Sequence, residues 1–171
     1  MDAWKRDYLK EEYFKLQDQY EDYDRRALQI KGWVGAGAIA AIAIGFDSEK
    51  SGSGMIWLVI SLFSCCFWYL EAKWKVFQYA ISDRIRLIEA HFRGEENALT
   101  KVSEPLQIYN WWYKSYRYDN PIYKYENDYR PKPLKSRIKA AAFQDFVMLP
   151  YLLIILICLG LLAHDLLLRV F

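Results

Sequence analysis

The sequence predicts an all-α fold: a helical membrane protein with three transmembrane helices, a long-helix hairpin and a cytoplasmic helical bundle. Apolar residues gather into three blocks separated by densely charged segments, although the mean hydropathy of the 171 residues is only −0.12. Aromatic residues make up 18% of the chain, and Tyr and Trp favour membrane–water interfaces. The charged segments also carry apolar residues at helical spacing. Together these observations predict helices that continue from a membrane into water.

Residues 1–31 form the first predicted element, a cytoplasmic amphipathic helix. Its apolar positions recur at spacings of 4, 3, 4, 3, 4 and 3, the stripe of a helix that packs on other helices: Leu9, Tyr13, Leu16, Tyr20, Tyr23, Ala27 and Ile30. Seven Lys or Arg and eight Asp or Glu surround the stripe and predict a solvated face. The pattern favours an aqueous helical bundle. Because Tyr replaces Leu at three of these positions, a surface that binds a partner is the alternative.

A transmembrane hairpin is predicted at residues 32–70. Its first apolar run, 32–46, is short for a span and consists mostly of Gly and Ala. Gly37, Ala41 and Gly45 repeat every fourth residue and form a small-residue face that allows close helix packing. We expect this face to lie against the second run of the hairpin, with a second subunit as the alternative.

The central element runs from Met55 to Arg93 without a Gly or Pro. At about 1.5 Å per residue it reaches about 60 Å, roughly twice the hydrocarbon thickness of a bilayer, so half of it must stand in water. Residues 71–94 are therefore a cytoplasmic helix that extends the second span, and Gly94 ends it. Its apolar stripe should pack on the N-terminal helix: Trp74, Phe77, Ile81, Ile85, Ile88 and Phe92.

The distribution of Lys and Arg orients the chain. Seven precede the first span, fourteen lie in residues 71–146, and the turn between the first two spans carries only Lys50. Basic residues concentrate on the cytoplasmic side of membrane proteins. The sequence therefore predicts a multi-pass protein of the cytoplasmic membrane whose N-terminus is cytoplasmic.

Residues 95–142 form an aromatic and basic cytoplasmic segment in which four prolines break long helices. Nine aromatic residues lie between Tyr109 and Tyr129, with basic residues among them. Two uses fit: an interfacial segment packed on the bundle or on lipid headgroups, and a stacking surface for single-stranded nucleic acid. Interleaved acidic residues disfavour nucleic acid. The candidate partner or interface residues are Trp111, Trp112, Tyr116 and Arg117.

Residues 143–171 hold the third predicted transmembrane helix and a short external tail. The apolar run from Phe146 to Ala163 is long enough to cross a bilayer, and Pro150 lies in its first turns. His164 and Asp165 follow near the outer end. They belong either to the membrane–water interface or, if they face a central lumen, to a titratable ring.

Few residues suggest catalysis, and we predict no enzyme, no cofactor and no metal site. The chain has two histidines and no Gly-rich phosphate loop, and its three cysteines lie inside apolar runs without metal-ligand spacing. One pattern competes with this interpretation. Arg86 and His91 have the Arg-x4-His spacing of HEPN ribonucleases, in which the arginine would stabilise phosphate charge and the histidine would act as acid or base. A solvated or interfacial histidine is the simpler explanation.

The order of the elements is itself distinctive. A charged amphipathic helix leads through Arg25-Arg-Ala-Leu-Gln-Ile-Lys-Gly-Trp33 into a tight two-span hairpin, which continues through Phe67-Trp-Tyr-Leu-Glu-Ala-Lys-Trp-Lys-Val-Phe-Gln78. Over about the first 95 residues this plan resembles the two-span SLATT effectors of bacterial anti-phage defence. It is also similar to the small membrane proteins that accompany some RNA-targeting CRISPR nucleases.

This resemblance implies an oligomer in the bacterial inner membrane that perturbs or permeabilises the lipid bilayer when infection is sensed. The small-residue face, the heptad-like stripe and the absence of enzyme motifs lead us to expect a homo-oligomeric, pore-forming effector. Two alternatives stay open. One is a membrane anchor or scaffold subunit that recruits a soluble defence partner through the aromatic segment. The other is a membrane-tethered HEPN-like ribonuclease that uses Arg86 and His91.

Overall fold

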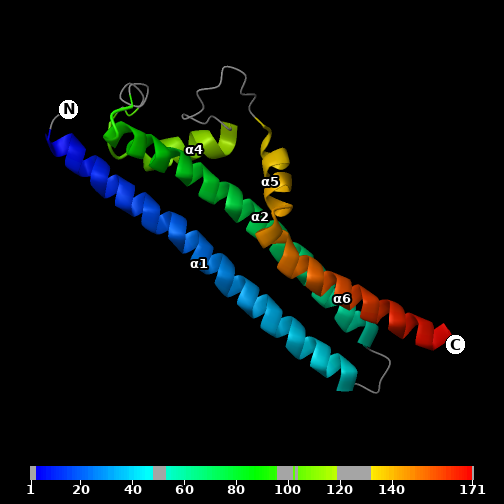
Figure 1. Ribbon diagram of the computed structural model, residues 1–171. Helices are drawn as coiled ribbons and strands as arrows, with labels where there is room; N and C mark the ends of the chain where they lie inside the picture. Colours follow the sequence, from blue (N-terminus) through cyan, green and yellow to red (C-terminus); the bar gives the residue numbers. More distant parts are fainter. Residues whose placement is uncertain (1–2, 48–52, 96–101, 103, 119–131, 171) are drawn as a thin grey trace. The chain divides into compact units, whose positions relative to one another are not determined.

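The computed structural model describes residues 3–47, 53–95, 102, 104–118 and 132–170 (Figure 1). Within these ranges the chain is all-helical, with five α-helices and no strand, which confirms the predicted all-α class. Lys50 in the predicted turn, and the aromatic residues from Tyr123 to Tyr129, lie outside the described residues.

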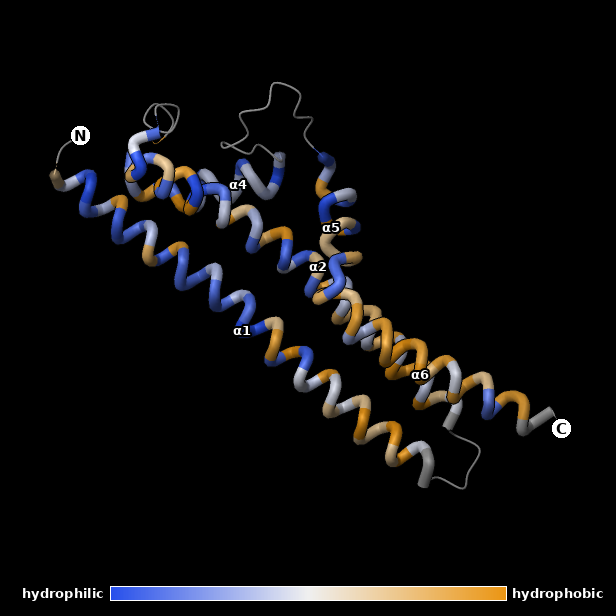
Figure 2. Tube along the Cα trace, viewed as in Figure 1, coloured by the Kyte–Doolittle hydropathy of each residue, from blue (hydrophilic) through white to orange (hydrophobic). Residues whose placement is uncertain are grey.

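Helix α1 spans Ala3–Asp47 and joins the predicted amphipathic helix to the first apolar run without a break. Its colour in Figure 2 changes from largely hydrophilic in the first part to largely apolar in the second. The Gly- and Ala-rich part stays helical because Ala is the best helix former and each Gly costs only about 1 kcal/mol relative to it.

Helix α2 spans Ser53–Phe92, close to the predicted bounds, and like α1 it has a strongly apolar part and a charged part. It ends in a Schellman motif. The amide of Glu95 donates to the Ala90 carbonyl at 3.0 Å, and the amide of Gly94 donates to the His91 carbonyl at 3.1 Å. Gly94 has a φ of 79°, which a residue with a side chain rarely adopts, so a glycine is needed there.

Three shorter helices follow. Helix α4 spans Ile108–Tyr118 and begins after Pro105, α5 spans Leu134–Ala142 and begins directly after Pro133, and α6 spans Asp145–Val170. The sequence predicts the last of these, but for residues 95–142 it predicts only that long helices are broken. Pro150 lies inside α6 and does not end it.

The chain divides into two compact units, and both long helices contribute to each. Unit 1 comprises Met1–Arg25 and Lys73–Lys139, and unit 2 comprises Arg26–Ala72 and Ala140–Phe171.

The core of unit 1 joins the two predicted stripes. Its buried cluster consists of Leu9, Leu16, Ile81, Ile85, Leu87, Ile88, Ala90 and Val102, and the half-buried Tyr13, Tyr20 and Tyr23 pack against it. The stripe of α1 therefore packs on that of α2, as their spacing predicts. Ile81, Ile85 and Ile88 are the members of the α2 stripe in this cluster. Phe77 stacks on Trp112 and Tyr116 of α4 instead, and Phe92 is 40% exposed.

Three helical segments are long and apolar enough to cross a membrane: Ala3–Gly45, Gly54–Phe92 and Asp145–Leu167. In their most apolar windows only 6%, 22% and 17% of the residues are buried within the chain. Most of this apolar surface therefore faces outward, as is expected of helices whose solvent is lipid.

Candidate functional site

Unit 2 has an inverted distribution of polarity. Large apolar side chains on its helices are exposed, among them Ile39, Ile44, Met55, Leu58, Leu62, Phe63, Leu149, Leu153 and Leu156. By contrast, Ser61, Ser64 and Glu71 are buried. In a water-soluble domain the apolar groups would be inside, because their burial drives folding. This distribution instead matches a protein that turns its polar groups away from lipid.

The polar groups that α2 turns into unit 2 lie on one stripe. Trp57, Ser61, Ser64, Trp68 and Glu71 follow one another at spacings of 4, 3, 4 and 3, which places them on one face of the helix. Across from them, α6 presents Tyr151, Cys158 and Asp165, which are seven residues apart. We call these eight residues the α2–α6 seam.

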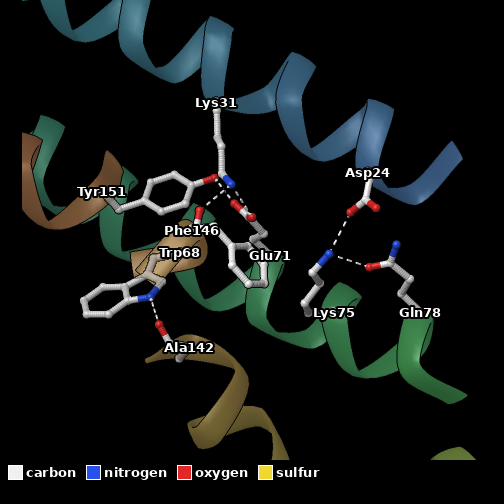
Figure 3. A network of polar contacts seen from close by, with 9 residues as sticks. All are labelled: Asp24, Lys31, Trp68, Glu71, Lys75, Gln78, Ala142, Phe146 and Tyr151. Carbon is white, nitrogen blue, oxygen red and sulfur yellow. Dashed lines mark hydrogen bonds and ion pairs between the residues drawn. The ribbon is translucent and has the colours of Figure 1, made fainter. Parts of the chain in front are cut away.

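At one end of the seam, Glu71 joins three helices (Figure 3). Its Oε1 lies 2.7 Å from Nζ of Lys31 on α1, and its Oε2 accepts a hydrogen bond of 2.8 Å from the hydroxyl of Tyr151 on α6. Lys31 also donates to the carbonyl of Phe146 at 2.7 Å. Glu71 is 5% exposed, so these charge-assisted bonds replace the water that the carboxylate has lost.

Asp165 lies at the other end of the seam. Its Oδ2 accepts a hydrogen bond of 2.9 Å from Nε1 of Trp57, whose side chain is 2% exposed. The Trp57 ring in turn packs against the backbone of Gly45 on α1. Because Trp57 meets Asp165 and Glu71 meets Tyr151, α2 and α6 run antiparallel within unit 2.

Hydroxyl and thiol groups occupy the middle of the seam. The Ser61 hydroxyl donates to the carbonyl of Trp57 at 2.9 Å and also hydrogen-bonds with the thiol of Cys158. Ser64 is 1% exposed, and its hydroxyl has no hydrogen-bond partner among the described residues. Trp68 donates from Nε1 to the carbonyl of Ala142 at 2.8 Å. The seam is thus polar from end to end.

This seam was not predicted from the sequence, although its signal is present there. Residues 55–70 form one apolar run, in which two serines at helical spacing do not stand out. Pairing them with the seven-residue spacing of Tyr151, Cys158 and Asp165 would have found the stripe. Nothing in the sequence shows, however, that Lys31 reaches Glu71.

Among the described residues of unit 1, Glu12 and Arg84 are the buried charged side chains. Arg84 Nε lies 2.9 Å from Glu12 Oε1, and Arg84 Nη2 donates to the carbonyl of Glu104 at 3.3 Å. Beside this pair, the hydroxyl of Tyr13 donates to the carboxylate of Glu89 at 3.0 Å, which raises the pKa of Tyr13. Lys75 on α2 forms another ion pair, with Asp24 on α1, in which Nζ and Oδ1 are 2.6 Å apart (Figure 3).

The two candidate ribonuclease residues lie on different sides of α2. Arg86 is exposed, and His91 is half-buried with its Nδ1 lacking a hydrogen-bond partner in the described part of the chain. At 3.6 residues per turn, five positions separate their directions by about 140°. His91 instead shares a face with Arg84, and burial together with the Arg84 charge lowers the pKa of His91. The HEPN-like assignment stays a prediction.

The small-residue face divides between covered and open positions. Gly45 is buried against Trp57, Ala41 is half-buried, and Gly37 is exposed with no atom within 4 Å of where a Cβ would lie. The hairpin therefore uses the end of this face near Gly45. The part around Gly37 is available to lipid or to another chain.

The predicted interface residues of α4 are partly engaged within unit 1. Phe77 on α2 stacks on Tyr116 with ring centroids 4.4 Å apart, and Trp112 stacks on Tyr116 at 5.2 Å. Arg84 lies 5.5 Å from the ring of Trp111, while Arg117 is exposed.

His164 is exposed, unlike its half-buried neighbour Asp165 in the seam. Among the described residues, His, Cys, Asp and Glu form no group of three or more that could hold a metal ion. Comparisons of the chain with protein-family models, with curated proteins and with solved structures found no match.

Proposed function

We propose that this chain is a three-span protein of the bacterial inner membrane that assembles with copies of itself and permeabilises the membrane in antiviral defence. The observation that carries the membrane assignment is the inverted polarity of unit 2, with Leu58, Leu62 and Leu153 exposed while Ser64 and Glu71 are buried. Leucines at such positions would be costly in water and are at home in lipid.

Self-assembly is supported by the apolar part of α1. Only 6% of its most apolar window is buried within the chain, and Gly37 has open space beside it. Lipid tails are as apolar as leucine, so helices associate in membranes mainly through close packing of small residues. A second copy of the chain would find such a surface at Gly37, Ala36 and Ala40.

The defence role is supported by the resemblance of the first half of the chain to SLATT effectors. In that role the protein collapses the potential of the host membrane once infection begins. Growth arrest of the infected cell would then stop the phage from multiplying.

A membrane-potential dye in phage-infected cells tests this function. Cells with the wild-type chain should depolarise, and cells with Gly37→Leu should not, because the new side chain fills the packing face. Gly35→Leu is the matched control, since Gly35 also has open space but lies about 200° around the helix from Gly37. An unchanged potential in infected wild-type cells, or a monomeric mass of the detergent-solubilised protein, contradicts the proposal.

The proposed orientation has its own test. Cys65, Cys66 and Cys158 are replaced by serine, and a single cysteine is placed at Lys15 or at Lys50. A membrane-impermeant maleimide added to intact spheroplasts should label the second position and not the first. Labelling of Lys15→Cys in sealed spheroplasts reverses the topology.

A membrane anchor is a second candidate, favoured by the aromatic side chains that α4 leaves exposed. Tyr109 and Tyr118 are 73% and 61% exposed. Purification from detergent extracts distinguishes the two functions. An anchor should carry a stoichiometric partner that is lost when both tyrosines become serine, whereas a self-assembling effector should carry only its own chain.

A further inference from the structure

We infer that the outer face of α5 binds the headgroups of anionic phospholipids where the chain enters the membrane. The inference rests on the proposed membrane insertion and deepens it, because it names the class of lipid that the protein selects. Lys135 and Lys139 are the two residues that make the contact.

The charges in this part of the chain have a single sign. From Lys132 to Gln144 the sequence holds four basic residues and no acidic one: Lys132, Lys135, Arg137 and Lys139. Helix α4, which α5 contacts, carries two basic residues and also no acidic one. A surface of this composition attracts anions, because no carboxylate on either helix reduces its positive field.

One face of α5 is engaged within unit 1. Arg137 donates from Nη1 to the carbonyl of Ser115 at 3.1 Å and from Nη2 to the carbonyl of Tyr116, both near the end of α4. Leu134 and Ile138 lie half-buried on the same side of α5 as Arg137. The two hydrogen bonds of the guanidinium, together with this packing, fix the rotation of α5 about its own axis.

Lys135 and Lys139 occupy the opposite face. Each lies two positions from Arg137, which is about 160° around the helix, and both are exposed. They are four residues apart, so about 6 Å of helix separates them. The general bias of basic residues toward the cytoplasm accounts for their number but not for their confinement to one outward face. Two neighbouring ammonium groups held in this way suit the phosphate of a lipid headgroup.

The covalent chain keeps this face near the membrane. Only Phe143 and Gln144 separate α5 from α6, which begins at Asp145 (Figure 1). From the rise of a helix and the reach of an extended link, the Cα atoms of Lys139 and Asp145 are at most about 16 Å apart. Headgroups extend about 5–8 Å beyond the hydrocarbon core, and charges act over a further Debye length of about 8 Å. Lys139 therefore stays within range of the headgroup charges.

Lipid headgroups suit this face better than nucleic acid does. Proteins that bind single strands combine cations with aromatic rings on which the bases stack. Helix α5 has the cations but no aromatic residue. Clusters of Lys and Arg beside a membrane span bind anionic lipids, and the long lysine side chain reaches the headgroups while its stem follows apolar surface.

Native mass spectrometry of the full-length protein in a neutral detergent tests the site. Phosphatidylglycerol and phosphatidylcholine with the same acyl chains are titrated separately. Each lysine beside an anionic headgroup contributes about fivefold to the association constant. Lys135→Gln combined with Lys139→Gln should therefore weaken the binding of phosphatidylglycerol by about 25-fold and leave that of phosphatidylcholine unchanged. Lys135→Arg combined with Lys139→Arg should retain it, because the charges remain.

The matched control is Lys10→Gln combined with Lys15→Gln, which removes the same number of charges from exposed positions of α1. The control should bind both lipids as the wild type does. If it loses phosphatidylglycerol as strongly as the α5 variant, net charge alone explains the binding and the site is overturned. If inorganic phosphate displaces phosphatidylglycerol at equal concentration, the lipid assignment also fails.

The remaining outcomes separate this inference from its rival and from the proposed function. If the wild type binds oligouridylate, the α5 variant does not, and the two lipids bind equally, the partner is nucleic acid and the inference is overturned. Equal binding of the two lipids by a wild type with an oligomeric mass overturns the lipid site alone. A preference for phosphatidylglycerol that the α5 variant loses, in a protein that leaves the potential of infected cells unchanged, supports the site and contradicts the proposed function. A chain that stays in solution without detergent contradicts both.

Discussion

The carboxylate of Glu12 on α1 binds the guanidinium of Arg84 on α2 across 72 positions of sequence, with Nε and Oε1 2.9 Å apart and both side chains at most 1% exposed. A second oxygen of Glu12 accepts a hydrogen bond of 2.8 Å from the amide of Leu106. One buried carboxylate thus connects both long helices with the segment that leads into α4. Unit 1 is held together by charge at this point as well as by its apolar core.

Removing Glu12 should therefore cost far more than removing its neighbour. Glu12→Ala leaves Arg84 buried without its counter-charge, and the free energy of unfolding should fall by about 3–5 kcal/mol. Glu11→Ala is the control, because Glu11 is exposed and its loss should change stability by less than about 0.5 kcal/mol. Chemical unfolding of the detergent-solubilised protein measures both. Equal stabilities of the two variants would contradict the role assigned to the pair.

Leu106 provides a prediction of the opposite sign. Its φ is 63°, a left-handed conformation that costs an L-residue about 1–2 kcal/mol, and its side chain is 71% exposed, so little burial is lost on substitution. Leu106→Asn should raise the unfolding free energy by up to about 1 kcal/mol, because asparagine tolerates this conformation. Leu106→Val should lower it. A Val variant as stable as the Asn variant would show that backbone strain is absent.

His91 should make unit 1 less stable in mild acid. Burial, together with the charge of Arg84, lowers the pKa of His91 below its ordinary value of about 6.5. The unfolded chain therefore binds this proton more tightly than the folded one. The stability that folding gains by keeping His91 neutral is fully present above pH 6.5, the pKa in the unfolded chain. It is lost as the pH falls from there toward the lower pKa of His91 in the folded chain. The melting temperature of the wild type should drop between pH 7.5 and 5.5 more than that of His91→Gln; identical drops would rule out this linkage.

Gly45 and Gly37 should respond differently to the same methyl group. A Cβ at Gly45 would lie 2.3 Å from Cη2 of Trp57, so Gly45→Ala forces the ring or the helix to move and should cost about 1–3 kcal/mol. Gly37→Ala meets no atom within 4 Å and should leave the stability of the single chain intact. Thermal unfolding in detergent at a concentration that keeps the protein monomeric compares the two. A destabilised Gly37→Ala under these conditions would mean that the α1 face packs within the chain.

The long helices could be predicted because their signals are local. Apolar residues at spacings of three and four, an uninterrupted run from Met55 to Arg93, and the glycine at position 94 act within a few turns of one helix. Helices α4 and α5 were missed because prolines in residues 95–142 indicated breaks without showing where helices resume. Arg84 was passed over for Arg86, since spacing alone does not separate a buried arginine from an exposed one.

By itself the sequence determined which segments are helical and which of them are apolar enough to enter a membrane, because both properties depend on neighbours along the chain. Only the tertiary structure decided which polar groups meet. Lys31, Glu71 and Tyr151 are up to 120 positions apart in sequence, and they converge because a buried carboxylate must regain the hydrogen bonds it loses with water. Which partner it finds depends on how three helices pack, and that packing is a property of the folded chain.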